Sequence, residues 1–246
     1  MSSTAPKTVY FVTGANRGIG FGLVSKLAER PDVLIFATAR QPEKATELNK
    51  LAEEKGNVVV VKLKVDSEED AKAAAKVVEE KAGKVDVVIA NAGISDSYYP
   101  AASTPIPVLK QHFEVNTLGP IILFQALQSL LSKSASPKFV VVSTGGASFG
   151  LAIPLKMMGY SLSKVAANFW TLKMHGEETG LTIFALSPGW VQTEMGSYGA
   201  AQMGVDSGPP VTLADSVAGI VKLVDESTRE THGGKLWDYT GEVLPW

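Results

Sequence analysis

The amino-acid sequence predicts an α/β fold, a doubly wound parallel sheet of seven strands with helices on both faces. Two observations lead to this prediction. Short runs rich in β-branched residues do not alternate between apolar and polar positions, which is typical of strands buried on both faces. Segments with helical spacing separate these runs, and this alternation indicates right-handed βαβ units with parallel strands.

The expected elements follow one another without a repeat or a linker, so we predict a single domain over residues 1–246. The strands are expected at residues 8–13, 33–37, 58–63, 85–90, 139–143, 182–186 and 235–237. The helices are expected at residues 19–30, 42–55, 68–81, 107–132, 159–177 and 213–224, the fourth of them interrupted. Ser67 and Asp70 form a candidate capping pair for the third helix.

Residues 192–210 interrupt the alternation of strands and helices. Four glycines precede two prolines there, which predicts a long loop rather than a regular element. The segment also contains Met195, Tyr198 and Met203, so we expect it to lie on the substrate side and to close over an apolar substrate as a lid. The alternative is a surface loop without a function.

The charge balance argues against a nucleic-acid partner. There are 23 Lys+Arg against 25 Asp+Glu, a formal net charge of −2 at pH 7, which does not suit a surface that neutralises phosphates. The chain has no cysteine, which excludes disulfides, thiolate nucleophiles and cysteine-ligated metals. The three histidines, His112, His175 and His232, lie far apart in the sequence, so we expect no metal site.

Targeting and membrane signals are not recognisable in the sequence. Residues 1–7 are rich in Ser, Thr and Pro, lack the pattern of a signal peptide, and are expected to form a frayed tail. No stretch approaches the roughly 20 apolar residues that span a bilayer, so we expect no membrane partner. Together with the absence of cysteine, these features predict a cytoplasmic protein.

A glycine-rich turn, TGANRGIG at 13–20, joins the first predicted strand to the first predicted helix. Gly14 permits the tight turn, Gly18 lets the backbone approach a pyrophosphate, and Gly20 allows close contact between helix and sheet. An ordinary turn is the alternative, but strand, spacing and helix together favour a Rossmann-type dinucleotide site. Its candidate cofactor contacts are Gly14, Asn16, Arg17, Gly18, Ile19 and Gly20.

The second predicted strand is followed by Arg40 where an NAD-binding domain would place a carboxylate for the ribose hydroxyls. Arg40, together with Arg17, is a candidate for a charge-assisted hydrogen bond to the 2′-phosphate of NADPH. The alternative is a solvated arginine before a helix. The missing acid favours NADPH/NADP+ as the cofactor.

The segment YSLSK places Tyr160 and Lys164 four residues apart, hence on one face of a helix. A phenol with its ordinary pKa near 10 is a poor proton donor and acceptor at neutral pH. A nearby ammonium favours the phenolate, so we expect Lys164 to lower the pKa of Tyr160. A Tyr and a Lys four residues apart also occur by chance on helices. The pair therefore indicates a catalytic site only in combination with the other motifs.

These motifs occur in one order along the chain: TGANRGIG, NAG at 91–93, KFVVVSTGGAS at 138–148, YSLSK and LSPGWVQT at 186–193. In this order the chain resembles the short-chain dehydrogenase/reductase family, in which TGxxxGxG opens the sequence. The resemblance extends from residue 8 to about residue 237. The ending GEVLPW is similar to the C-factor and sniffer type carbonyl reductase branch of that family.

The resemblance implies a role for further residues. Asn116, in FEVNTLG, would bind a water that connects Lys164 to solvent, whereas its alternative role is to cap or break a helix. Tyr160 and Lys164 would also contact the cofactor, with Lys164 holding the nicotinamide ribose. The other residues implied at the cofactor are Asp66 at the adenine amino group, Asn91, Ala92 and Gly93 along the cofactor, and Pro188, Gly189, Val191 and Thr193 at the nicotinamide.

A hydroxyl is expected beside Tyr160 to hold the substrate oxygen. Counted from the start of the fifth strand, the catalytic serine of the family falls on Thr144, whereas Ser143 is the residue followed by xxG. Both remain candidates. Ser148 is interpreted as a turn residue.

The resemblance implies an NADPH-dependent oxidoreductase that transfers hydride between the nicotinamide and a ketone, an aldehyde or a secondary alcohol, with Tyr160 as proton donor or acceptor. Two alternatives stay open: a catalytically silent NADP(H)-sensing binding protein of the same fold, and a polyketide or sterol ketoreductase of narrow specificity. The sequence also leaves open whether the chain forms a homo-oligomer, such as a dimer or tetramer.

Overall fold

The computed structural model describes residues 8–151 and 153–246, so the frayed tail expected at residues 1–7 lies outside the described residues. One sheet runs through this part of the chain, in the order β3-β2-β1-β4-β5-β6-β7-β8. Its strands are β1 (Thr8–Val12), β2 (Val33–Ala39), β3 (Val58–Lys62), β4 (Val87–Ala90), β5 (Lys138–Val142), β6 (Thr182–Ser187), β7 (Leu236–Asp238) and β8 (Val243–Leu244). The strands from β1 to β7 pair in parallel, as predicted.

Over the described residues the sheet has eight strands rather than the predicted seven. The chain turns back after β7, and β8 pairs with β7 in the antiparallel sense. Gly241 permits this turn with a φ of 94°, and Asp238 N–H donates to Glu242 O at 2.8 Å. A strand of two residues that includes the exposed Val243 has no periodic pattern, so sequence reasoning did not find it.

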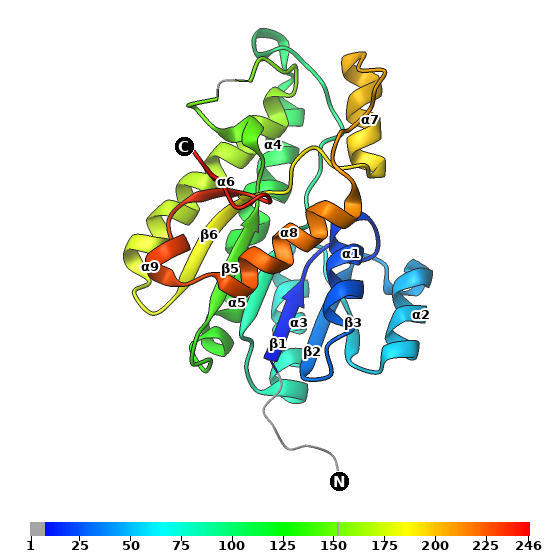
Figure 1. Ribbon diagram of the computed structural model, residues 1–246, viewed down its shortest axis with the longest axis vertical. Helices are drawn as coiled ribbons and strands as arrows, with labels where there is room; N and C mark the ends of the chain where they lie inside the picture. Colours follow the sequence, from blue (N-terminus) through cyan, green and yellow to red (C-terminus); the bar gives the residue numbers. More distant parts are fainter. Residues whose placement is uncertain (1–7, 152) are drawn as a thin grey trace.

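The longer helices pack on the two faces of the sheet, and Figure 1 shows α8 crossing the near face. Helices α1 (Gly18–Leu27), α2 (Thr46–Lys55) and α8 (Leu213–Glu226) contribute to one apolar core, whereas α3 (Glu68–Ala82), α5 (Gly119–Leu131) and α6 (Met158–Glu177) contribute to the other. Alternate residues of β1 enter the two cores, with Tyr10 and Val12 in the first and Val9 and Phe11 in the second. The fold is therefore doubly wound.

The interrupted fourth helix consists of three segments. Helix α4 (Ile106–Phe113) leads into a π-helical segment, η3 (Glu114–Leu118), and then into α5. A π-helical turn is typical of functional sites, and this one contains the buried Asn116.

Residues 192–210 contain a helix, which corrects the prediction of a loop. Helix α7 (Glu194–Met203) begins after Thr193, whose hydroxyl accepts a hydrogen bond from Gly196 N–H at 3.1 Å. A Cβ on Gly196 would lie 2.0 Å from Val191 O, so this glycine serves close packing rather than flexibility. Gly204 then ends the helix with a φ of 67°.

Short helical segments lie between the longer elements. The 3-10 turns are η1 (Pro42–Lys44), η2 (Ala101–Ser103) and η4 (Gly145–Ala147), and α9 (Arg229–His232) precedes β7. Among the residues that the structure describes, no helix has both the length and the apolar character needed to cross a membrane.

Candidate active site

The strand order reverses between β1 and β4, where a doubly wound sheet places its ligand site. The glycine-rich turn leaves β1 at this point, with Gly14 and Gly18 in the left-handed region at φ values of 65° and 57°. A Cβ on Gly20 would lie 2.2 Å from Gly14 O, so only glycine lets α1 approach the turn this closely. These positions confirm the tight turn expected at Gly14 and the close contact between helix and turn expected at Gly20.

The turn after β4 supports the glycine-rich turn. Asn91 Nδ2 donates to Thr13 O at 2.9 Å and to Gly14 O at 3.3 Å, and Ala92 N–H donates to Thr13 Oγ1 at 2.9 Å. In the described part of the chain, no side chain caps the N-terminus of α1 at Arg17. Its first N–H groups are therefore available to an anion, which suits a pyrophosphate.

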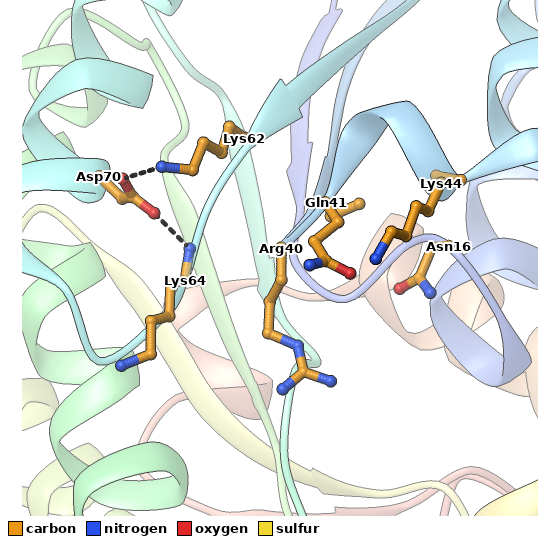
Figure 2. A pocket seen from close by; sticks show the side chains of 9 residues that line it. Asn16, Arg40, Gln41, Lys44, Lys62, Lys64 and Asp70 are labelled. Atoms are coloured by element: carbon orange, nitrogen blue, oxygen red, sulfur yellow. Dashed lines mark hydrogen bonds and ion pairs between the residues drawn. The ribbon is translucent and has the colours of Figure 1, made fainter.

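Four cationic side chains line a cavity of about 450 Å³ beside the glycine-rich turn. In Figure 2, Arg40 projects between Lys44 on one side and Lys62 and Lys64 on the other. The carboxylate of Asp70 accepts from Lys62 Nζ at 3.1 Å and from Lys64 N–H at 2.9 Å. The complete lining is Asn16, Ala39, Arg40, Gln41, Lys44, Ala45, Lys62, Lys64 and Asp70.

The structure brings Arg40 and Asn16 into this cavity but not Arg17. The exposed guanidinium of Arg17 forms an ion pair with Glu194 at the start of α7. Sequence reasoning missed Lys44, Lys62 and Lys64. Lys44 follows Arg40 by four residues, a spacing visible in the sequence, whereas Lys62 is recognisable only from the register that pairs it with Ala39.

Asp66 forms an ion pair with Lys64, with 3.0 Å between carboxylate and ammonium. The neighbouring Val65 lies with Thr13 and Ala92 around a gap too small for a water molecule, at the carboxyl ends of β1 and β4. Ser67 caps α3 by accepting from Asp70 N–H at 3.1 Å, which confirms half of the predicted capping pair. The Asp70 carboxylate instead binds the end of β3, so the reciprocal half of that prediction is wrong.

Tyr160 and Lys164 lie in the first turns of α6 and share one face, as the spacing predicts. Lys164 Nζ lies 5.9 Å from the centre of the Tyr160 ring and donates to Val142 O at 2.6 Å. Lys164 is buried, and this burial lowers its pKa to about 8. The pair is thus held at the carboxyl end of β5.

The pKa of Tyr160 is raised, contrary to the expected lowering by Lys164. Burial of the phenol is the main cause, and the neighbouring phenol of Tyr98 raises the pKa further. A hydrogen bond with the Thr144 hydroxyl acts in the opposite direction and lowers the pKa of Tyr160. The buried ammonium of Lys164 is turned to the backbone carbonyl of Val142 rather than to the phenol.

Ser143 and Thr144 face opposite sides of the sheet because neighbouring residues of an extended chain alternate. The buried Ser143 Oγ donates to Asn168 Oδ1 at 2.6 Å, away from Tyr160. Thr144 interacts with the Tyr160 phenol and also accepts from Gly146 N–H at 3.1 Å. The structure therefore brings Thr144, and not Ser143, to the tyrosine.

Ser148 occupies a turn, as interpreted from the sequence. Its hydroxyl donates to Pro245 O at 2.6 Å and accepts from Leu151 N–H at 3.1 Å. These contacts attach the loop after β5 to the end of the chain and use both hydrogen-bonding functions of the hydroxyl.

Asn116 lies beside Lys164, but its amide is engaged with protein partners. Its Oδ1 accepts from Ile94 N–H at 2.8 Å, and its Nδ2 donates to Ile94 O at 2.9 Å and to Ser163 Oγ at 3.0 Å. A Cβ on Gly93 would lie 3.0 Å from Asn116 Oδ1 and 3.5 Å from Lys164 Nζ, so the three residues converge. Asn116 does not cap a helix; it lies in the π-helical segment that interrupts the α-helical pattern between α4 and α5.

The turn after β6 closes the site from the other side. Gly189 has a φ of 78°, and Pro188 O accepts from Ser216 Oγ at 2.7 Å. Val191 forms an isolated bridge with Val211. The side chain of Thr193 lies over the glycine-rich turn, because a Cβ on Gly18 would lie 3.6 Å from its methyl group. The predicted nicotinamide contacts thus border the predicted phosphate contacts.

In the two described ranges, no group of three or more histidines or carboxylates is arranged to hold a metal ion. The fold and the site together define a class: a doubly wound parallel sheet with a glycine-rich turn at its switch point and a Tyr-Lys pair at the neighbouring strand end. The comparisons with known proteins identify the family within this class.

The sequence pattern described as short chain dehydrogenase matches residues 8–203. A norsolorinic acid ketoreductase of Aspergillus parasiticus is 40% identical over 98% of this chain and 92% of its own length. The NADPH-bound carbonyl reductase from chicken fatty liver is 31% identical, with a TM-score of 0.87, over 98% of this chain and 99% of that one. The carbonyl reductase Sniffer of D. melanogaster is 25% identical, with a TM-score of 0.86, over the same shares.

The chain therefore belongs to the short-chain dehydrogenase/reductase family. The expected similarity to the sniffer type of carbonyl reductase is confirmed by the Drosophila structure.

Proposed function

We propose that this chain is an NADPH-dependent reductase that transfers hydride between the nicotinamide and a ketone, an aldehyde or a secondary alcohol. The observation that carries the proposal is the arrangement at the switch point: Tyr160, Lys164 and Thr144 lie together, and the cationic cavity lies beside the glycine-rich turn. The relatives named as carbonyl reductases and ketoreductases support a carbonyl substrate.

The residues present fit NADPH. The uncapped N-terminus of α1 suits the pyrophosphate, and the glycine-rich turn is tightly packed at Gly14 and Gly20. Arg40 and Lys44, with Lys62 and Lys64 opposite, would hold the 2′-phosphate through charge-assisted hydrogen bonds. Gly189, Val191 and Thr193 would border the nicotinamide, and Asp66 the adenine. Bound NADPH supplies the hydride, and its oxidised form supplies a positive charge beside Tyr160.

In the proposed reduction, the Tyr160 hydroxyl donates its proton to the substrate oxygen as the carbonyl carbon is reduced. Thr144 donates a hydrogen bond to the same oxygen and stabilises the developing negative charge. The positive charge of the oxidised cofactor would favour the phenolate that remains. The ammonium of Lys164, whose pKa burial lowers to about 8, would hold the nicotinamide ribose. Asn116 would act as a positioning residue, since its amide holds Ile94 and Ser163 in place near Lys164.

Residues 192–210, with α7 at their centre, form the substrate side of the site in this proposal. The helix carries the exposed Met195 and Tyr198. Its first turn is attached to the glycine-rich turn by the ion pair of Arg17 with Glu194. Binding of the cofactor and position of the lid would therefore be coupled.

The proposal is tested by following NADPH absorbance with a panel of ketones, aldehydes and secondary alcohols. Wild-type protein should consume NADPH with at least one carbonyl compound, and Tyr160→Phe should abolish turnover because the phenyl ring has no proton to donate. The Tyr160→Phe variant should still bind NADPH, measured by cofactor fluorescence. NADPH binding without turnover on any carbonyl would instead indicate the cofactor-sensing alternative.

A further inference from the structure

Tyr98 and Tyr198 contact each other above the edge of the sheet at which Tyr160 lies. Tyr98 belongs to the loop that follows β4, and Tyr198 belongs to α7. Their rings meet edge to face, with centroids 5.8 Å apart and an interplanar angle of 65°. Figure 1 shows this loop and α7 side by side beyond the carboxyl ends of the strands. The contact therefore bridges two segments that are about 100 residues apart, as their numbers show.

The backbone leaves space for this contact. A Cβ on Gly199 would lie 2.6 Å from the Tyr98 hydroxyl, so the glycine next to Tyr198 makes room for the Tyr98 ring. That hydroxyl is also 3.2 Å from Ser95 Oγ, which holds the ring in place. Tyr198, in contrast, is 45% exposed, so part of its ring surface is open to a ligand. One ring is fixed and the other is accessible.

The pair borders the proton donor of the proposed reaction. Asn116 binds Ile94 of the same loop and donates to Ser163 Oγ at 3.0 Å, and Ser163 donates in turn to Tyr160 O at 2.7 Å. The loop that carries Tyr98 is thereby held beside the first turn of α6, and the phenol of Tyr98 raises the pKa of Tyr160. The proposed reduction assigns no task to Tyr98 and gives Tyr198 only a place on the substrate side.

We propose that Tyr98 and Tyr198 form an aromatic clamp that binds the ring of an aryl ketone and directs its carbonyl to Tyr160. The proposal rests on the proposed carbonyl reductase function. An aryl ring forms edge-to-face or offset contacts with both tyrosines, whereas an alkyl chain of equal size gains only from burial. The clamp should therefore favour aryl over alkyl ketones.

The clamp is tested with an aryl methyl ketone and a straight-chain methyl ketone of equal carbon number. The measured quantity is the ratio of their kcat/KM values. Tyr198→Ala should lower this aryl-to-alkyl ratio about tenfold, mainly through the aryl KM, because the ring contact is lost. Tyr198→Phe should retain the ratio of the wild type. The conservative variant separates the loss of a ring from the loss of the hydroxyl.

Tyr99→Ala is the matched control. Tyr99 is 41% exposed and next in sequence to Tyr98, yet it forms no ring pair with another aromatic residue of the described chain. Its substitution should leave the aryl-to-alkyl ratio unchanged. An unchanged ratio in Tyr198→Ala, or an equal fall in Tyr99→Ala, would overturn the clamp.

Binding measured without turnover separates the clamp from the proposed function. The aryl ketone is titrated into protein loaded with NADP+, and contact with its ring protons is followed by saturation-transfer NMR. The clamp predicts binding that weakens about tenfold in Tyr198→Ala and not in Tyr99→Ala. If the variants bind as predicted but wild type shows no turnover, the reductase function is contradicted and the clamp is not. If wild type turns over ketones but all variants bind the aryl ketone equally, the clamp is contradicted and the reductase function is not.

Discussion

At the scale of single residues, Ser143 and Thr144 are neighbours with different partners: Ser143 binds Asn168, and Thr144 contacts Tyr160. Thr144→Ala should lower kcat/KM about a hundredfold or more, because a hydrogen-bond donor to the developing alkoxide is removed. Ser143→Ala should leave kcat/KM within a few-fold of wild type but lower the free energy of unfolding by about 1–3 kcal/mol, since buried Asn168 loses its partner. Steady-state kinetics and denaturant unfolding of both variants measure these effects.

The opposite pattern, with activity lost in Ser143→Ala and retained in Thr144→Ala, would show that the serine orients the substrate. Ser148→Ala serves as the control, because its hydroxyl is engaged with Pro245 and Leu151. It should affect kcat/KM less than Thr144→Ala does.

Lys164 predicts a pH dependence of stability in the cofactor-free protein. Its pKa is lowered from 10.5 to about 8 by burial, so between these values the unfolded chain binds more protons than the folded one. Stability should therefore rise with pH over this range, and the cost of burying the ammonium, about 3 kcal/mol, should be relieved. Denaturant unfolding of wild type and Lys164→Met at pH 8 and pH 10.5 isolates this contribution.

The difference in unfolding free energy between wild type and Lys164→Met is the decisive quantity. It should shift by up to about 3 kcal/mol in favour of wild type as the pH rises. A difference that does not depend on pH would mean that Lys164 keeps its ordinary pKa in the folded protein.

Arg40 predicts the choice of cofactor. Arg40→Asp should weaken NADPH binding about tenfold and improve NADH binding, because a carboxylate repels the 2′-phosphate but accepts hydrogen bonds from ribose hydroxyls. Lys44, Lys62 and Lys64 line the same cavity, so some preference for the phosphate should persist. Titration of each reduced cofactor at fixed salt concentration measures the effect.

Lys50→Asp makes the same change of charge on α2, at an exposed position outside the lining of the cavity. It should leave the ratio of the two affinities unchanged. If the two substitutions changed this ratio equally, Arg40 would act only through the overall surface charge and not through contact with the cofactor.

At the scale of elements, the position of α1 depends on Gly20. Gly20→Ala should lower the free energy of unfolding by about 2 kcal/mol or more and abolish high-affinity NADPH binding, because a Cβ would lie 2.2 Å from Gly14 O and 2.6 Å from Asn91 Nδ2. The helix would have to move away from the glycine-rich turn. Thermal or denaturant unfolding, together with NADPH titration, tests this expectation.

Gly176→Ala is the matched control for the same substitution in a helix. Gly176 lies near the end of α6, and a Cβ there would meet nothing within 4 Å. The change should raise the free energy of unfolding by up to about 1 kcal/mol through helix propensity and leave NADPH binding unchanged. Similar losses in both variants would indicate that Gly20 is not specifically required for packing.

Helix α7 shows where local rules mislead. Gly196 and Gly199 lower its intrinsic helix propensity, which is why the sequence indicates a loop. A Cβ on Gly196 would collide with Val191 O, and a Cβ on Gly199 would collide with the Tyr98 hydroxyl. Helix propensity takes no account of these two contacts. Tertiary packing therefore overrides propensity here, and the cap supplied by Thr193 supports the helix at its start.

At the scale of the whole molecule, the parallel sheet was predictable and its last strand was not. The strands from β1 to β6 carry β-branched residues, and the helical segments between the parallel strands leave only parallel connections of the observed kind. Strand β8 depends on a turn and on pairing with β7. Such pairing is a long-range property of the sheet and leaves no local pattern.

The cationic cavity is likewise assembled by the whole fold. Arg40 and Lys44 follow β2, whereas Lys62 and Lys64 come from β3 and its end. Parallel pairing of β2 with β3 brings Ala39 beside Lys62, so the four cations meet at one edge of the sheet. The sequence indicated one member of this set, Arg40, through the absence of an acid.

The sequence by itself determined the alternation of strands and helices, the glycine-rich turn and the common face of Tyr160 and Lys164. These features depend on residues within one or two turns of each other, where backbone geometry follows directly from residue type. Only the tertiary structure decided that Thr144 rather than Ser143 faces Tyr160, and that Tyr98 meets Tyr198. Such contacts join segments distant in sequence, and packing, not local spacing, selects them.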